Sequence, residues 1–229
     1  MGQSAADPPV RTAPSAAERP ARRDVRVCFA GDSLVAGTGD ESALGWVGRV
    51  TAAAIASGLD LTAYNLGVRG ATSVQVARRL AIEARPRLTA GDDARIVLSF
   101  GVNDTIVEDG RQREPTARTL EALRSMRDRS APVPILLVGP PAVDDDEQND
   151  RIRLLDAALE QEAAALALPY VPAFPATVSS PVWRRPVRVG DGFHPDAAGY
   201  AHLAAVLAPP IVAWPVSYTH LTLPTKRIV

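Results

Sequence analysis

The chain of 229 residues is poor in cysteine and histidine, with one and three of them respectively. Its one cysteine, Cys28, cannot form an internal disulfide and lies in the apolar run VRVCFA, so we expect a small buried side chain there. No group of His, Cys, Asp and Glu residues shows metal-ligand spacing, and the acidic run at 144–147 is expected to open a helix and not to bind calcium. The sequence therefore implies no metal and no other cofactor.

Clustered positive charge and long apolar runs are also missing. The formal net charge is -1 and no basic stripe is present, which argues against nucleic acid as a partner. No segment approaches the roughly 20 apolar residues that a membrane span needs, so we expect no integral membrane association. Residues 1–24 are rich in Ala, Pro and Arg and lack the apolar centre of an export signal. We expect this segment to be disordered and the protein to be cytoplasmic.

The C-terminal end of the chain differs in composition from the rest. Residues 216–229 contain no alanine and hold the only lysine, whereas the body uses arginine and is rich in alanine. The segment VSYTHL resembles the translation of a transposon-end sequencing adapter. We therefore expect a non-native tail at 216–229, with the native C-terminus lost near Pro215, and a single domain at 25–215.

Five short apolar runs predict strands at 25–30, 61–66, 94–100, 133–138 and 168–173. Helical spacing of apolar residues appears between them, after Pro115 and again from Ile152 to Leu166. Apolar strands joined by helices are typical of a parallel sheet that is covered on both faces. The predicted fold class is α/β, a three-layer α/β/α sandwich with a five-stranded parallel sheet and flavodoxin-like strand order. Residues 104–114 and 173–190 are expected to be irregular and to border a cleft.

Residues whose side chains could take part in catalysis follow the predicted strands. The sequence reads GDSL at 31–34, NLGVRGAT at 65–72, GVND at 101–104 and DGFHP at 191–195. Because parallel strands end at one edge of a sheet, a serine, a glycine-rich backbone, an amide and a carboxylate–histidine pair would converge there. A serine hydroxyl attacks an ester only when a base accepts its proton, and an imidazole is the usual base. Ser33 and His194 are the candidates.

Asp191 precedes this histidine by three residues, with Gly192 between them, so that a tight turn would bring its carboxylate onto the imidazole of His194. Pro195 suits the first position of a helix that begins directly after the histidine. Of the other histidines, His202 is expected on a helix in a solvated or packing role, and His220 lies in the suspect tail.

An ester hydrolase also needs hydrogen-bond donors for the oxyanion that forms on the attacked carbonyl. The backbone N–H groups of Ser33 and Gly70 and the side-chain amide of Asn103 would supply three. Glycine permits close approach of the backbone, and an amide donates without carrying charge.

The four blocks GDSLVAG, NLGVRGATS, GVND and DGFHP resemble those of the SGNH/GDSL hydrolase superfamily, which contribute serine, glycine, asparagine and histidine in that order. The resemblance extends from about Val25 to Leu207. It implies catalytic roles for Ser33, Asp191 and His194 and an oxyanion hole formed by Ser33, Gly70 and Asn103.

The second block offers two candidate glycines, and the third block departs from the family pattern at one position. Gly67 is a weaker alternative to Gly70, because the family pattern places an asparagine several residues before its glycine and Asn65 suits Gly70 better. Val102 stands where many members carry a second glycine, which changes the cleft wall and leaves the amide of Asn103 in place.

The predicted function is a serine esterase that cleaves small or short-acyl carboxylic esters through an acyl-enzyme, with a small-molecule ester as its partner. A lysophospholipase or acyl thioesterase of the same fold is the alternative. A carbohydrate deacetylase is disfavoured because aromatic side chains make up only 5% of the chain, and Trp183, the one near the catalytic turn, is expected to pack in the core. From a different class, a non-catalytic module could hold a small anion at a glycine-rich turn, and a fluorophosphonate probe would not label it.

Overall fold

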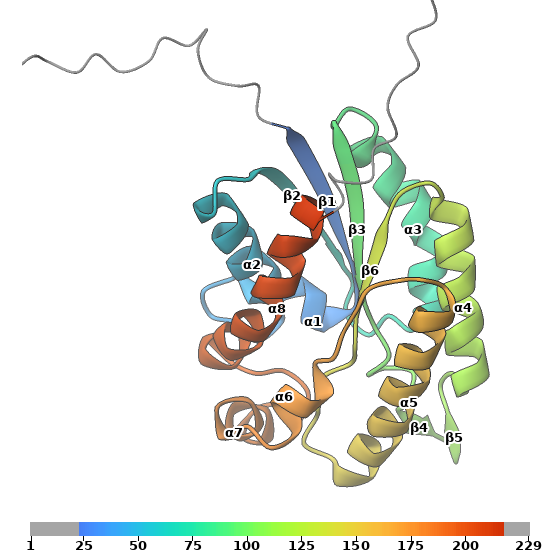
Figure 1. Cartoon of the computed structure of the whole chain (residues 1–229). Coiled ribbons are helices and arrows are strands. Elements are labelled where there is room, and N and C mark those ends of the chain that lie inside the picture. Colours follow the sequence, from blue (N-terminus) through green and yellow to red (C-terminus); the bar gives the residue numbers. More distant parts are fainter. Residues whose placement is uncertain (1–22, 218–229) are drawn as a thin grey trace, which may run out of the picture.

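Five parallel strands form the centre of the computed structural model, which describes residues 23–217 (Figure 1). They are β1 (Asp24–Gly31), β2 (Asp60–Gly67), β3 (Asp93–Ser99), β6 (Ile135–Val138) and β7 (Tyr170–Val171). Their order across the sheet is β2-β1-β3-β6-β7, and all four neighbouring pairs are parallel. The predicted five-stranded parallel sheet and its flavodoxin-like order are confirmed.

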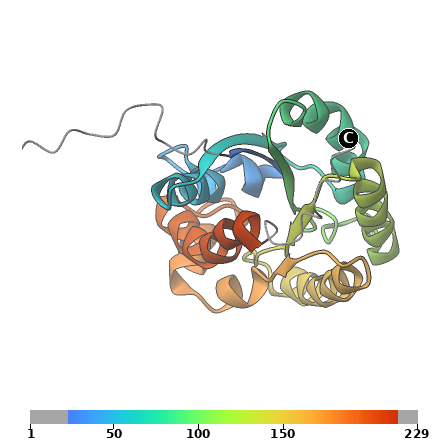
Figure 2. The same ribbon diagram turned by 45° about the horizontal axis from the view of Figure 1, so that its top comes forward.

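Helices cover both faces of this sheet, which gives the predicted three layers (Figures 1 and 2). One face carries α3 (Ser73–Leu88), α4 (Thr116–Ser130) and α5 (Asp146–Ala165), and the other carries α2 (Gly45–Ala56) and α8 (Ala197–Ser217). The one-turn helix α1 (Ser33–Ala36) follows β1 directly. The acidic run opens α5 as predicted, because the carboxylate of Asp145 accepts a hydrogen bond from the N–H of Gln148.

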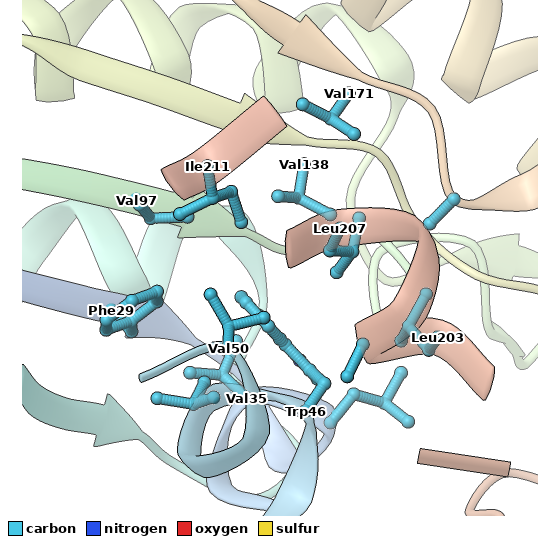
Figure 3. Packing of buried hydrophobic residues seen from close by; sticks show 14 of the residues in the cluster. Phe29, Val35, Trp46, Val50, Val97, Val138, Val171, Leu203, Leu207 and Ile211 are labelled. Atoms are coloured by element: carbon cyan, nitrogen blue, oxygen red, sulfur yellow. The ribbon is translucent and has the colours of Figure 1, made fainter. Parts of the chain in front are cut away.

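The inner parts of β1, β3 and β6 are largely apolar because these central strands are buried on both faces. In β1, Val27 and Phe29 belong to the core beneath α2 and α8, whereas Cys28 and Ala30 belong to the core beneath α3 and α4. Figure 3 shows side chains of the first core, which come from β1, β3, β6 and β7 and from α1, α2 and α8. Cys28 is buried as predicted, and burial raises the pKa of its thiol to about 12.

Two stretches that the sequence predicts to be irregular contain regular structure. Residues 104–114 form an antiparallel hairpin of β4 (Val107–Glu108) and β5 (Arg111–Gln112), and 173–190 form α6 (Phe174–Val178) and α7 (Pro181–Val189). These helices are too short to show a period, and their prolines suggest loops. In both helices, however, a proline occupies one of the first two positions, where its missing N–H costs nothing.

The predicted domain limits fall close to the ends of the described structure. Strand β1 begins at Asp24, one residue before the predicted start, and α8 runs to Ser217, two residues into the predicted tail. The remainder of both predicted terminal segments, 1–22 and 218–229, lies outside the described residues.

Within the described part of the chain, one helix, α8, is long and apolar enough over Ala197–Trp214 to cross a membrane. From the sequence, no segment was expected to approach the apolar length of a membrane span, so this candidate was not foreseen. The contacts of α8 indicate a core helix. Leu203, Leu207 and Ile211 pack into the core cluster that α8 shares with α2 and the sheet (Figure 3).

Candidate active site

The four sequence blocks meet in one cleft at the carboxyl edge of the sheet, the lower edge in Figure 1. Ser33 follows β1, the turn containing Gly70 follows β2, Asn103 follows β3, and the loop with Asp191 and His194 precedes α8. The cleft has a volume of about 400 Å³, and all five predicted site residues line it. The convergence expected from the topology of a parallel sheet is therefore present.

A continuous chain of hydrogen bonds links the three predicted catalytic side chains. The Nε2 atom of His194 lies 2.7 Å from the Oγ atom of Ser33. On the other side of the ring, Nδ1 lies 2.6 Å from Oδ2 of Asp191. An imidazole that carries its hydrogen on Nδ1 presents a lone pair on Nε2 to the serine hydroxyl, which is the arrangement that proton transfer from serine requires.

The carboxylate of Asp191 is fixed by the tight turn that its spacing predicts. Its Oδ1 atom accepts hydrogen bonds from the backbone N–H groups of Phe193 (3.0 Å) and His194 (2.9 Å), which leaves Oδ2 for the imidazole. Partial burial acts to raise the pKa of this carboxyl, but the hydrogen bonds from the side chain and backbone of His194 and from Phe193 hold it at about 2. Asp191 is therefore ionised across the neutral range.

The expectation that a helix begins directly after His194 is wrong. Helix α8 begins at Ala197, and the side chain of Asp196 accepts a hydrogen bond from the N–H of Gly199 (2.9 Å). An aspartate is a strong N-cap, and its bond to the backbone sets the start of the helix after Pro195.

Two backbone N–H groups of the cleft are available to an oxyanion. Neither the N–H of Ser33 nor that of Gly70 has an acceptor among residues 23–217. Gly70 occupies the third position of a type II turn that the bond from Ala71 N to Val68 O closes (3.2 Å), and its φ of 72° explains why the position holds glycine. Arg113 restrains the turn from outside by donating to the carbonyl oxygen of Gly70 (3.2 Å).

Gly67 serves a different purpose. A Cβ atom at this position would lie 2.2 Å from the backbone nitrogen of Ala36, so glycine permits β2 to pack against α1. Its N–H already donates to the side-chain oxygen of Asn65 (2.9 Å). Of the two alternatives, the geometry favours Gly70 as an oxyanion donor.

Asn103 differs from the free donor that the sequence suggests. Its Nδ2 atom donates to Oδ2 of Asp32 (3.2 Å) and to the carbonyl oxygen of Ala71 (3.1 Å), so both amide hydrogens have acceptors. Burial raises the pKa of Asp32 to about 7, although the N–H of Leu34 donates to its carboxyl and acts in the opposite direction. To bind an oxyanion, Asn103 would have to share or exchange one of its two hydrogens.

The buried Asp104, to which the sequence analysis gave no role, ties two blocks together. Its carboxylate accepts bonds from the N–H and hydroxyl of Ser73, at the start of α3, and from the hydroxyl of Thr119 in α4 (2.8 Å). This fixes the loop that carries Asn103 against the helix that follows the Gly70 turn. The only available signal was the aspartate that ends GVND, which an interior contact and a catalytic contact would explain equally well.

The remaining candidates lie outside the cleft. Trp183 is fully buried and donates from Nε1 to the carbonyl oxygen of Ala142 (2.7 Å), as expected for a core residue. Nε2 of His202 lies 2.9 Å from the carbonyl oxygen of Ala176, which is a packing contact between α8 and α6, and His220 is outside the described residues. No group of three potential metal ligands occurs within residues 23–217.

The walls of the cleft give it an apolar character beside the polar catalytic edge. Four apolar residues and one cation join the predicted site residues: Leu34, Val102, Ile106, Phe193 and Arg69. Apart from Val102, none of these was expected in the wall from the sequence, because they come from four separate segments whose mutual approach depends on the fold. A cleft of this kind can hold an uncharged ester carbonyl next to the serine hydroxyl and the two free N–H groups.

Comparison with known proteins identifies the family and the fold of the chain. The sequence profile of the GDSL-like lipase/acylhydrolase family matches residues 29–202. No curated protein matches the chain. A crystal structure of a lipase/acylhydrolase from Enterococcus faecalis superposes with a TM-score of 0.70 at 25% identity and covers 83% of this chain and 96% of its own.

Two further solved structures share the fold at lower identity. A member of the lipolytic protein G-D-S-L family from Veillonella parvula has a TM-score of 0.62 and 21% identity, covering 86% of this chain and 100% of its own. An acetylxylan esterase from Geobacillus stearothermophilus has a TM-score of 0.61 and 19% identity, covering 80% and 91% respectively.

Proposed function

Because this chain belongs to the GDSL-like lipase/acylhydrolase family, we propose that it is a serine esterase that hydrolyses small or short-acyl carboxylic esters through an acyl-enzyme on Ser33. Family membership supports the broader assignment, which is an esterase, lipase or acylhydrolase function. The observation that supports the catalytic assignment is the hydrogen-bonded chain from Asp191 through His194 to Ser33 in an open cleft.

In the proposed first step, the Oγ atom of Ser33 attacks the ester carbonyl carbon while Nε2 of His194, 2.7 Å away, accepts the hydroxyl proton. The imidazole thereby becomes positively charged, and the ionised carboxylate of Asp191 stabilises it. The carbonyl oxygen acquires negative charge, which the free N–H groups of Ser33 and Gly70 would bind.

The tetrahedral intermediate then loses its alcohol. Its C–O bond to the leaving group breaks, the carbonyl re-forms, and His194 donates its proton to the departing oxygen, which leaves an acyl group on Ser33. Water then attacks this acyl-enzyme as His194 accepts a water proton, and collapse of the second intermediate returns that proton to the serine and releases the acid.

Asn103 is the proposed third donor, in a role that begins only as charge develops. In the resting site its amide hydrogens are held by Asp32 and Ala71. A full negative charge is a stronger acceptor than a neutral carbonyl oxygen, so the oxyanion would compete with Ala71 for one of them.

The size of the cleft supports a small substrate. Its volume of about 400 Å³ lies toward the lower end of the range for small-molecule pockets, about 300–1,000 Å³. We expect kcat/KM for p-nitrophenyl esters to be highest between acetate and butyrate and to fall for octanoate and palmitate. Hydrolysis of lysophospholipids and acyl thioesters is measured in parallel. The Ser33→Ala variant gives the background rate for every substrate. Maximal activity on a long-chain lysophospholipid would overturn the substrate assignment.

A further inference from the structure

Arg69 lies in the cleft immediately before the proposed oxyanion donor. It occupies the second position of the type II turn formed by residues 68–71, and Gly70, whose N–H is free, is the third. Arg69 lines the same cleft as Ser33 and His194, and it is exposed to solvent. The peptide that would bind the oxyanion therefore joins Arg69 to Gly70.

The guanidinium of Arg69 has no hydrogen-bond or ion-pair partner in the part of the chain that the structure describes. The neighbouring Arg113 shows the contrast, since it pairs with Glu108 (3.8 Å) and donates to the carbonyl oxygen of Gly70. Nothing in the turn requires arginine at position 69, because the strict demand of a type II turn is the positive φ at its third position, Gly70. The side chain thus contributes a free cation to the cleft and no visible support to the fold.

The carboxylates of the cleft are committed elsewhere. Asp32 is buried and accepts from the N–H of Leu34 and from Asn103. Asp191 accepts from two backbone N–H groups and contacts the imidazole of His194. A substrate entering the cleft therefore meets one unpaired positive charge and no uncommitted carboxylate.

The charge of Arg69 also acts inside the site. Burial and nearby carboxylates raise the pKa of the Tyr200 hydroxyl, and Arg69 acts in the opposite direction. This direction is consistent with the position of Arg69 among the residues that line the cleft.

We propose that Arg69 forms an anion subsite, so that the preferred esters carry an anionic group such as a carboxylate close to the ester bond. This inference rests on the proposed esterase function and names a substrate class for it. A planar guanidinium binds a carboxylate through two parallel N–H···O bonds, which fix orientation as well as supply charge. An anion held beside Gly70 would place the ester carbonyl against the free N–H groups.

The test compares esters in matched charged and neutral pairs. For an anion on the acyl side, p-nitrophenyl hemisuccinate is compared with p-nitrophenyl butyrate, and for an anion on the alcohol side, 4-acetoxybenzoate is compared with 4-acetoxybenzamide. The quantity measured is the ratio of kcat/KM for the charged ester to that for its neutral partner. The variants are Arg69→Gln, Arg69→Lys and, as a matched control, Arg185→Gln, which removes an exposed arginine of α7 outside the cleft.

We expect the wild-type ratio to be high in one pair, which identifies the side of the ester that bears the anion. Arg69→Gln should lower that ratio about 5- to 20-fold, mainly by raising KM for the charged ester. This factor lies between the contribution of an exposed ion pair and that of a hydrogen bond to a charged group. Arg69→Lys should retain part of the ratio, Arg185→Gln should leave it unchanged, and added salt should reduce it.

Two outcomes overturn the subsite, and they are distinguishable. If the protein hydrolyses the neutral esters but shows the same ratio in wild type and Arg69→Gln, the anion subsite is wrong and the esterase proposal stands. If none of the four esters is hydrolysed, both proposals fail.

Discussion

Replacing Asp191 with asparagine separates the catalytic role of this side chain from its structural role. The Oδ1 atom of Asp191 accepts two backbone N–H bonds and its Oδ2 atom contacts Nδ1 of His194. Asparagine has the same shape but only one acceptor oxygen. If that oxygen keeps the two backbone bonds, the amide NH₂ group faces the imidazole and can only donate to it.

The size of this preference follows from the bonds themselves. Each backbone hydrogen bond contributes about 0.5–1.5 kcal/mol, so reversing the amide would sacrifice about 1–3 kcal/mol. The imidazole is then held with its hydrogen on Nε2, pointing at Ser33, and cannot accept the serine proton. The analogous change in serine proteases lowers kcat about 10⁴-fold. Because the Asp191 side chain is 51% exposed, water replaces part of the lost interaction. We therefore expect Asp191→Asn to lower kcat by a smaller factor, about 10²- to 10³-fold.

The assay pairs kcat for p-nitrophenyl acetate with the melting temperature, for Asp191→Asn and Asp191→Ala. Alanine removes the acceptor of the two backbone hydrogen bonds in the turn, but it leaves the imidazole of His194 free to carry its hydrogen on Nδ1. We therefore expect Asp191→Asn to be the more stable variant and to be no more active than Asp191→Ala. A near-native kcat for Asp191→Asn would refute the reasoning.

Two further predictions concern the polar groups behind the serine. Asn103→Ala should lower kcat about 10²- to 10³-fold with little change in KM, because an oxyanion donor binds charge that exists only in the transition state. It should also lower the melting temperature, since the bonds to Asp32 and Ala71 are lost; a lowered melting temperature with native kcat would remove Asn103 from the oxyanion hole. The raised pKa of Asp32, about 7 in the folded protein against about 3.9 in an unfolded chain, means that the folded state binds the extra proton between these values. The free energy of unfolding should therefore decline from about pH 4 to pH 7 through this group. Asp32→Asn should flatten that decline in urea titrations, and an equally steep decline in the variant would contradict the prediction.

The sequence predicts the sheet and the position of the cleft for one physical reason. Strands that are buried on both faces are apolar throughout, and the residues after such strands share an edge. Ser33, Gly70 and Asn103 follow three of these strands, so the approximate site could be located without coordinates. Asp191 and His194 lie farther along the chain, between α7 and α8. The spacing of Asp191 and His194 also predicts their contact, because only a local turn is needed.

The hydrogen bonds of Asn103 could not be predicted in this way. Its acceptors lie 71 and 32 residues away in the chain, on Asp32 and Ala71. Such contacts depend on how three loops pack, which no local pattern records. The same holds for the free guanidinium of Arg69, because whether an arginine is paired is a property of the folded surface.

The short helices α6 and α7 were missed for a different reason. Proline disfavours helix interiors but suits helix starts, and α7 contains Pro181 at its start and Pro186 inside. Local composition therefore indicates a loop. Burial of Trp183 and Val187 on one side of α7 supplies the stabilisation that propensity does not.

The central claim is that Ser33 is a nucleophile activated by His194 and Asp191, and active-site labelling tests it most directly. The wild-type protein is treated with a fluorophosphonate, and the adduct is located by peptide mass spectrometry. The account predicts a single adduct on Ser33, absent from the folded Ser33→Ala variant and slowed in His194→Ala. Labelling that persists at another residue in Ser33→Ala, or a wild-type protein that does not react, would contradict it.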